Sequence, residues 1–221
     1  MWLMVILSLL WYEIFVLRGR EYYVVSLAVV VISLLGFLLS FEKSRPSVAL
    51  LTMIASLCAL AVACRIAFFF LPQVKPIAAI VIISGVALGP EVGFVTGAMS
   101  AFVSNFYFGQ GAWTPFQMFA LGLIGFFAGV FFRGTHKRIP LMIYGFFSVV
   151  ILYGGIVDIN TIFFTSQETT PQIVAGVYAA GLPLNLVFGS VTAIFLFLLH
   201  RPILTKIERL DRKYQWIDKE D

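Results

Sequence analysis

The stretch VALLTMIASLCALAVACRIAFFF, residues 48–70, decides the fold class of this chain. Arg65 is its only charged residue, and most of its other side chains are apolar or small. A helix of about 20 predominantly apolar residues crosses the hydrocarbon core of a lipid bilayer. The stretch therefore predicts a transmembrane helix with one charge near its C-terminal end.

The composition of the whole chain extends this prediction. Of its 221 residues, 61% are hydrophobic and 12% are charged, and the mean hydropathy is +0.99. A soluble domain has about a quarter of its residues charged, so this chain has too few charged residues to cover a soluble fold. The composition predicts an all-α, polytopic transmembrane helical bundle. It excludes a soluble enzyme, a nucleic-acid-binding domain and a disulfide-stabilised scaffold.

Further apolar segments lie on both sides of this stretch, and chemically distinct breaks separate them. Pro72 and Pro76 end one segment because two prolines so close together cannot continue a helix. Gly89 and Pro90 mark a tight turn between two short segments. We expect eight spans, at 2–17, 22–41, 48–70, 75–89, 91–108, 116–132, 140–157 and 172–199, with a polar outer loop at 158–171.

The segments divide into three regions. Residues 1–47 are predicted to form an N-terminal transmembrane hairpin, 48–199 a six-helix core that binds the substrate, and 200–221 a basic tail. Most of the 15 Lys and Arg residues lie at 42–46, at 133–138 and in the tail. Because basic loops stay in the cytoplasm, we expect a multi-pass protein of the cell membrane with both termini cytoplasmic.

Ala55, Ala59 and Ala63 recur every four residues in the segment 48–70, so they share one helix face. In lipid, a face of small side chains allows another helix to approach closely. Two interpretations remain open, namely packing against a helix of the same chain and docking of a partner protein's helix. Gly85, Gly89, Gly93 and Gly97 recur at the same interval, and we assign them to close helix packing at the inner turn.

Polar residues gather near the outer end of the third segment. Arg65 precedes that end, and Gln73 and Lys75 follow it. A charge near a span end can snorkel to the interface, or it can face an internal cavity and meet an anionic ligand group. The sequence leaves both alternatives open and places the three residues among the candidate substrate contacts.

The stretch NFYFGQGAWTPFQ, residues 105–117, combines amides with aromatic rings at the same outer face. Flat apolar rings with oriented hydrogen-bonding groups are typical of ligand sites. An interfacial aromatic belt would explain the rings alone. Asn185, in the last segment, needs a hydrogen-bonding partner at membrane depth, which can be a neighbouring helix or the ligand. The candidate substrate-binding residues from these two regions are Asn105, Tyr107, Gln110, Trp113, Thr114, Gln117 and Asn185.

Several kinds of site are missing from the sequence. It has no GxxxxGK[ST] phosphate loop, no HExxH motif and no Cys/His cluster with metal-ligand spacing. Acidic residues deep in the core segments, which an ion-driven carrier would need, are absent apart from Glu91 at the inner turn. We therefore predict no enzyme activity, no cofactor and no resident metal. The chain has groups that bind a solute and none that would power its transport.

With these features, residues 48–199 resemble the S components of energy-coupling factor (ECF) transporters. The resemblance rests on the AxxxA face, the glycine-spaced helices around Gly89 and Pro90, and the polar outer loops. Within that group, LPQVKP (71–76) and FGQGAWTPFQ (108–117) are similar to cobalamin-type members. The N-terminal hairpin departs from the six-helix pattern.

The resemblance implies a function and partners. It implies a substrate-binding subunit for vitamin uptake that works with a transmembrane coupling subunit and two cytoplasmic ATPases. Ala55, Ala59 and Ala63 would then be the docking face for the coupling subunit. Cobalamin or a related corrinoid is the expected ligand, with riboflavin, a queuosine precursor, thiamine or pyridoxine as alternatives. A membrane-embedded enzyme or a structural membrane protein is the alternative from a different class.

Overall fold

The computed structural model describes residues 22–43, 45–165 and 170–214, and all of its regular elements in these residues are helical. The all-α prediction is confirmed. The predicted span 2–17 lies outside the described residues. The helices are α2 (Tyr22–Lys43), α3 (Val48–Ala67), α4 (Ile77–Leu88), α5 (Pro90–Phe108), α6 (Thr114–Phe132), α7 (Arg138–Phe147), the π-helix η1 (Ser148–Tyr153), α8 (Gly154–Thr165) and α9 (Pro171–Tyr214).

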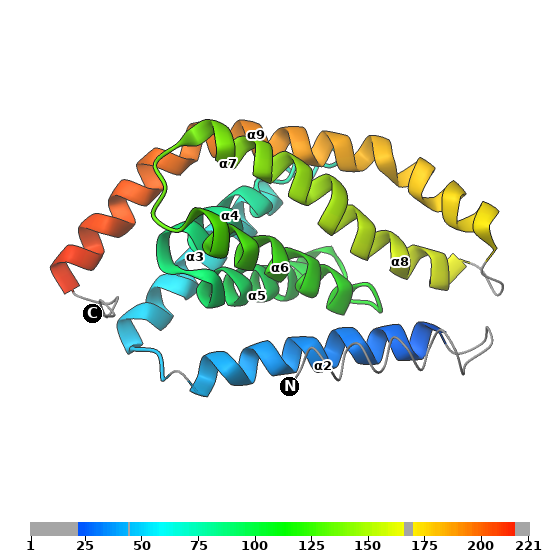
Figure 1. The fold of residues 1–221 in the computed structure, drawn as a ribbon, viewed down its shortest axis with the longest axis horizontal. Coiled ribbons are helices and arrows are strands. Elements are labelled where there is room, and N and C mark those ends of the chain that lie inside the picture. Colours follow the sequence, from blue (N-terminus) through cyan, green and yellow to red (C-terminus); the bar gives the residue numbers. More distant parts are fainter. Residues whose placement is uncertain (1–21, 44, 166–169, 215–221) are drawn as a thin grey trace.

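Successive core helices run back and forth between two ends of the bundle (Figure 1). We call the end where α3 and α5 finish and α6 begins the polar end, and the opposite end, which carries the loop 133–137, the basic end. Within the described residues, four helices are long and apolar enough to cross a membrane. They cover Val48–Ala67, Thr114–Phe132, Arg138–Phe163 and Pro171–Leu210.

The centre of the bundle is α4. Its sequence, IAAIVIISGVAL, is apolar on every side, and nearly all of its residues are buried. A helix without a polar face must be surrounded by other helices, and α4 packs against α3, α5, α6 and α9. Prolines and glycines set its limits, since Pro76 precedes it and Gly89 follows it with a φ of 101°.

Glycines allow α4, α5 and α6 to pack with their backbones in contact. A Cβ atom at Gly85 would lie 2.1 Å from the carbonyl oxygen of Gly125, and one at Gly93 would lie 2.3 Å from the same oxygen. The assignment of the glycine ladder to packing is confirmed for Gly85, Gly93 and Gly97, whereas Gly89 serves the turn through its φ of 101°. The glycines of α4 and α5 pack against a second set of glycines on α6, which was not predicted from the sequence.

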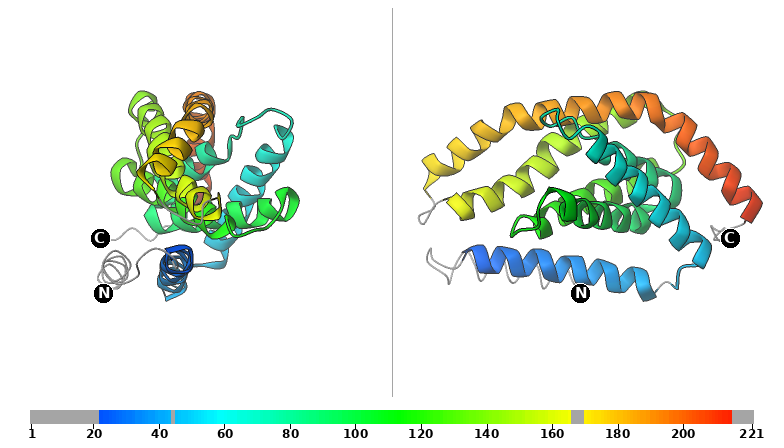
Figure 2. Two further views of the ribbon diagram at one scale, coloured as in Figure 1. Left: turned by 90° about the vertical axis from the view of Figure 1, so that its right-hand side faces the viewer. Right: turned by 180° about the vertical axis from the view of Figure 1, so that it is seen from behind.

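The remaining helices enclose this centre on two sides (Figures 1 and 2). On one side α2 lies against α5 and α6, where the Phe37 and Phe94 rings stack with centroids 4.0 Å apart. On the other side α7, η1 and α8 run beside α9, which arches over the bundle. Pro183 and Pro202 lie inside α9, and a proline inside a helix removes a backbone hydrogen bond and bends it.

Two predicted boundaries are wrong. Residues 158–165, predicted as a polar loop, continue the helix as α8, because Ile159 packs against the cluster formed by α2, α5 and α6 and Asn160 is buried. The last segment, predicted to end at residue 199, continues as helix to Tyr214. Leu204 and Ile207 explain this extension, since both are buried on it.

Candidate functional site

A buried polar network joins α3, α5 and α6 at the polar end of the bundle. We call it the polar network, and its members are Arg65, Ser104, Asn105, Gln110, Thr114 and Gln117. The local sequence explains the arrangement. Gly109 ends α5 with a φ of 101°, and Pro115 lies in the first turn of α6. The chain therefore reverses within a few residues and brings the end of α5 beside the start of α6.

Arg65 enters the network from the last turn of α3. Its Nη1 donates to the hydroxyl of Ser104 and, over 3.0 Å, to Oδ1 of Asn105. Its guanidinium carbon lies 4.4 Å from the centre of the Phe108 ring, a cation–π contact. The side chain is buried, at 8% exposure, and Nε has no hydrogen-bond partner in the described structure. Arg65 therefore points into the bundle and does not snorkel to the interface, and its contact with a ligand stays a prediction.

Asn105 is the centre of the network. It is 1% exposed. Its Oδ1 accepts from Arg65, and its Nδ2 donates to Oγ1 of Thr114 over 3.1 Å and to Oε1 of Gln117 over 2.9 Å. A buried amide that is paired on both sides is held in one orientation. The network therefore fixes the guanidinium of Arg65 and the amide of Gln117 relative to each other.

The other three residues predicted from the stretch 105–117 lie at its exposed edge. Gln110 is exposed and holds the turn together, because Thr114 donates to its Oε1 over 2.9 Å while its Nε2 donates to the carbonyl of Phe102 over 3.0 Å. Tyr107 and Trp113 are also exposed, and the Trp113 ring lies against Gly111. The structure brings Thr114 and Gln117 together with Asn105 and leaves these two rings outside the network.

The loop 68–76 places a second cation near Arg65. The Nζ of Lys75 donates to Oε1 of Gln73 over 3.0 Å and lies 6.0 Å from the centre of the Phe188 ring on α9. Burial lowers the pKa of Lys75 to about 8, and the neighbouring positive charge of Arg65 adds to this effect. Gln73 has a φ of 59°, which a residue other than glycine rarely adopts. Gln73 and Lys75 thus form one unit at the polar end.

Tyr153 and Phe188 connect this loop to the far side of the bundle. Their rings meet edge to face with centroids 5.1 Å apart, and Tyr153 lies within electrostatic reach of Arg65. Tyr153 ends the π-helix η1, and single turns of π-helix are frequent at functional sites. Four residues of this region were not predicted from the sequence, namely Ser104, Phe108, Tyr153 and Phe188. Of these four, only Tyr153 could have been recognised from the sequence, because it places a phenol inside an apolar segment.

Asn185 lies apart from the network, on α9. Its Nδ2 donates to Oδ2 of Asp158 on α8 over 3.2 Å. Both residues line a groove of about 510 Å³ between α8 and α9, together with Tyr178, whose hydroxyl donates to the carbonyl of Gly155. The expected hydrogen-bonding partner of Asn185 is therefore a helix of the same chain, which satisfies its amide at membrane depth.

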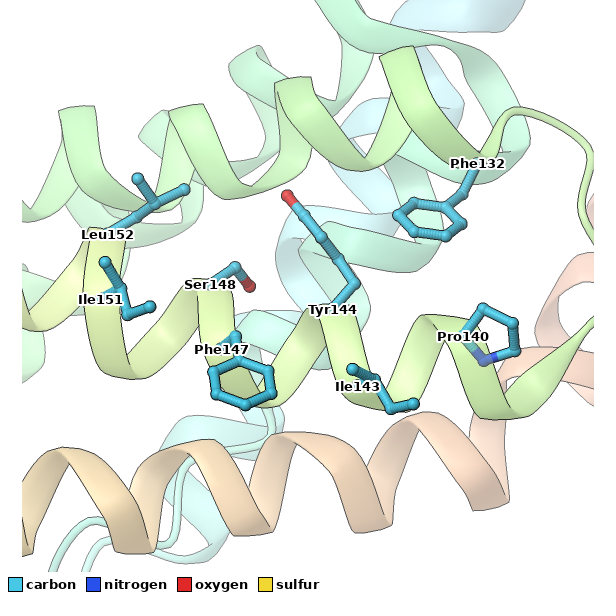
Figure 3. A pocket seen from close by; sticks show the side chains of 8 residues that line it. All are labelled: Phe132, Pro140, Ile143, Tyr144, Phe147, Ser148, Ile151 and Leu152. Carbon is cyan, nitrogen blue, oxygen red and sulfur yellow. The ribbon is translucent and has the colours of Figure 1, made fainter.

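A second groove, of about 590 Å³, lies along α7 and η1 (Figure 3). Its lining side chains are apolar or hydroxyl-bearing. The hydroxyl of Tyr144 donates to the carbonyl of Ile124 on α6 over 2.6 Å, so it is already paired. The groove has no charged group to orient a polar solute, and we do not assign substrate binding to it. Its lining residues are Phe132, Pro140, Ile143, Tyr144, Phe147, Ser148, Ile151 and Leu152.

The alanine face of α3 points away from the bundle. Ala55, Ala59 and Ala63 are all exposed, whereas the opposite side of α3, with Leu57 and Ala61, is buried. Ser47 caps the helix by accepting from the backbone N–H of Leu50 over 3.2 Å. The face is thus presented on a capped helix, and the described residues leave it uncovered.

Comparisons with known proteins identify the family of the chain. A family model described as "ECF-type riboflavin transporter, S component" matches residues 43–206. A UPF0397 protein of Vibrio atlanticus (strain LGP32) is 27% identical over an alignment of 118 residues, which covers 48% of this chain and 64% of that protein. The chain thus aligns with slightly less than two thirds of that relative's length. No solved structure matches it.

Proposed function

The chain belongs to the family of ECF-type transporter S components, and from this premise we propose that it captures a water-soluble vitamin at the polar end of the bundle. The observation that carries the proposal is the buried network around Asn105, which orients Arg65 and Gln117 beside the loop 68–76. The rings of Phe108 and Phe188 lie against the two cations of this region. Oriented polar groups among rings suit a ring-bearing solute.

The family is one of transporter subunits and not of enzymes. We propose that this member works with a transmembrane coupling subunit and two cytoplasmic ATPases. The described residues contain no group of three His, Cys, Asp or Glu side chains that could hold a metal. The proposed division of labour is that this chain supplies the binding site and the ATPases supply the energy. The exposed face formed by Ala55, Ala59 and Ala63 is the proposed contact for the coupling subunit.

Two vitamins are candidates, and a different observation supports each of them. A corrinoid such as cobalamin follows from the resemblance of 71–76 and 108–117 to cobalamin-type members, and its amide side chains suit Gln117 and Gln73. Riboflavin follows from the description of the matching family, and its flat ring system suits the aromatic side chains. We propose cobalamin or a related corrinoid as the first candidate and riboflavin as the second.

The substitution Gln117→Leu tests the position of the site. We expect it to weaken binding of the vitamin about tenfold or more, because a buried polar group of the ligand or of Asn105 loses its partner. The affinity is measured by titrating cobalamin and riboflavin separately into the purified chain in detergent. Gln172→Leu, the same change at an exposed position on α9, is the matched control and should bind like the wild type. Equal affinities for the two variants would move the site away from the network.

The ligand that co-purifies with the chain from rich medium identifies the vitamin directly. We expect a 1:1 complex whose absorption spectrum and mass match either a corrinoid or a flavin. A complex with a compound of neither class would leave the family membership intact and would overturn both candidates.

A further inference from the structure

Arg65 and Lys75 are two neighbouring positive charges in a largely buried region. Arg65 is 8% exposed in the last turn of α3. Lys75 lies in the loop that follows α3, where its Nζ contacts Gln73 and faces the Phe188 ring. The positive charge of Arg65 contributes to the lowered pKa of Lys75. Like charges that lie near each other away from water repel. A protein keeps such a pair only where something offsets the cost, so the arrangement needs an explanation.

The described part of the chain does not supply a carboxylate to this pair. The contact between His136 and Glu208, at the basic end, involves neither cation of this pair. Asp158 acts electrostatically on Tyr153 and Tyr178. Its side chain accepts from Asn185. The contacts of Arg65 are with neutral groups, namely Ser104, Asn105 and the Phe108 ring.

Each cation also keeps capacity for a ligand. The Nε of Arg65 is a buried donor without a partner, and a guanidinium that is fixed on one side by Asn105 is oriented for an oxyanion on the other. Lys75 has three N–H donors, and the one hydrogen bond found for it in the described structure goes to Gln73. A buried donor without a partner needs an explanation, and an oxyanion of the ligand would provide one.

We propose that Arg65 and Lys75 together hold an oxyanion, a phosphate ester or a carboxylate, carried by the transported vitamin. This inference rests on the proposed function, which identifies the ligand as a vitamin. The new element is that the vitamin carries a negative charge. It favours the corrinoid over riboflavin, because cobalamin contains a phosphodiester whereas riboflavin has no ionised group at neutral pH. It also predicts that a phosphorylated flavin binds more tightly than the unphosphorylated one.

The pair predicts a pH dependence with a defined sign. Lys75 is protonated below its pKa of about 8 and loses its charge above it. A bound oxyanion favours the protonated form, so affinity should be constant below about pH 7 and fall above pH 8, by at most about tenfold per pH unit. The groups that face Lys75 are Arg65 from α3, Gln73 from its own loop and Phe188 from α9. Gln73 and Phe188 have no ionisable group, and a guanidinium does not lose its proton in a protein.

The first test does not depend on which vitamin binds. Thermal unfolding of the purified full chain is measured in sodium phosphate and in sodium chloride at equal ionic strength. We expect phosphate to raise the unfolding midpoint of the wild type by about 3 °C. The midpoint of Lys75→Gln should be the same in phosphate and in chloride. Arg209→Gln removes one positive charge from an exposed basic groove on α9 and should keep the full shift. A shift that survives in Lys75→Gln, or no shift in the wild type, would overturn the proposed oxyanion site.

The second test uses two pairs of ligands that differ in phosphate, cobalamin with cobinamide and riboflavin 5′-phosphate with riboflavin. In whichever pair binds, Lys75→Gln should weaken the phosphate-bearing member about tenfold and change the other less than about twofold. If Lys75→Gln changes neither member although both bind, the anion inference fails and the proposed function stands. If neither pair binds but the phosphate shift is lost in Lys75→Gln, the anion site stands and both vitamin candidates fail.

Discussion

Replacing Ala59 with tryptophan should abolish vitamin uptake by the assembled transporter while the isolated chain still binds its ligand normally. Ala59 lies in the middle of the exposed alanine face of α3, between Ala55 and Ala63. Small side chains allow two helices in lipid to approach closely enough for backbone and side-chain contacts to form. An indole at this position would hold the partner helix several ångströms away, so we expect uptake to fall at least about twentyfold.

The same substitution should leave the site unaffected. The residue that α3 contributes to the polar network is Arg65, and it lies on the buried side of the helix. Uptake is measured in cells that carry all subunits, and assembly by co-purification with the coupling subunit. Val130→Trp, a similar enlargement at an exposed position of α6, is the matched control and should retain uptake. Normal uptake by Ala59→Trp would remove the docking assignment.

Replacing Gly93 with valine should prevent the bundle from forming. A Cβ atom there would lie 2.3 Å from the carbonyl oxygen of Gly125 and 2.7 Å from Cα of Gly85. All of these are backbone atoms, which cannot move aside without separating α4, α5 and α6. Overpacking of this kind typically costs about 1–3 kcal/mol and more where the backbone must shift, so we expect a loss of at least about 3 kcal/mol.

The matched control is Gly176→Ala on α9, where an added Cβ meets no atom within 4 Å. Alanine has a higher helix propensity than glycine by about 1 kcal/mol, so this variant should be as stable as the wild type or slightly more so. Stability is read from the yield of monodisperse protein in detergent and from the midpoint of thermal unfolding. A Gly93→Val variant with a normal midpoint would show that the three helices do not pack through these glycines.

The fold could be predicted largely from the sequence because its determinants are local. Apolar length alone identifies α3, and the prolines and glycines at 72, 76 and 89 mark the limits of α4. The two wrong boundaries share a cause. Residues 158–165 and 200–214 have polar or charged sequences, yet each keeps apolar residues at helical spacing that pack on the bundle, as Ile159 and Leu204 do. Polarity was therefore a poor guide to where these helices end.

The candidate site could be predicted in part. Arg65 and Asn105 stand out because polar groups at membrane depth need partners, and the structure joins them directly. The bond between Asn105 and Gln117 depends on how the turn between α5 and α6 folds, which the sequence does not specify. Phe188 could not be recognised among 23 phenylalanines, since its position over Lys75 is set by the packing of α9.

The central claim is that this chain binds a vitamin but depends on other subunits to move it. The most direct measurement is uptake of labelled cobalamin, or of the vitamin found to co-purify, into lipid vesicles that contain the purified chain alone or together with the coupling subunit and both ATPases. We expect stoichiometric binding without accumulation by the chain alone, and ATP-dependent accumulation by the complete assembly. Accumulation against a gradient by the chain alone would contradict the central claim.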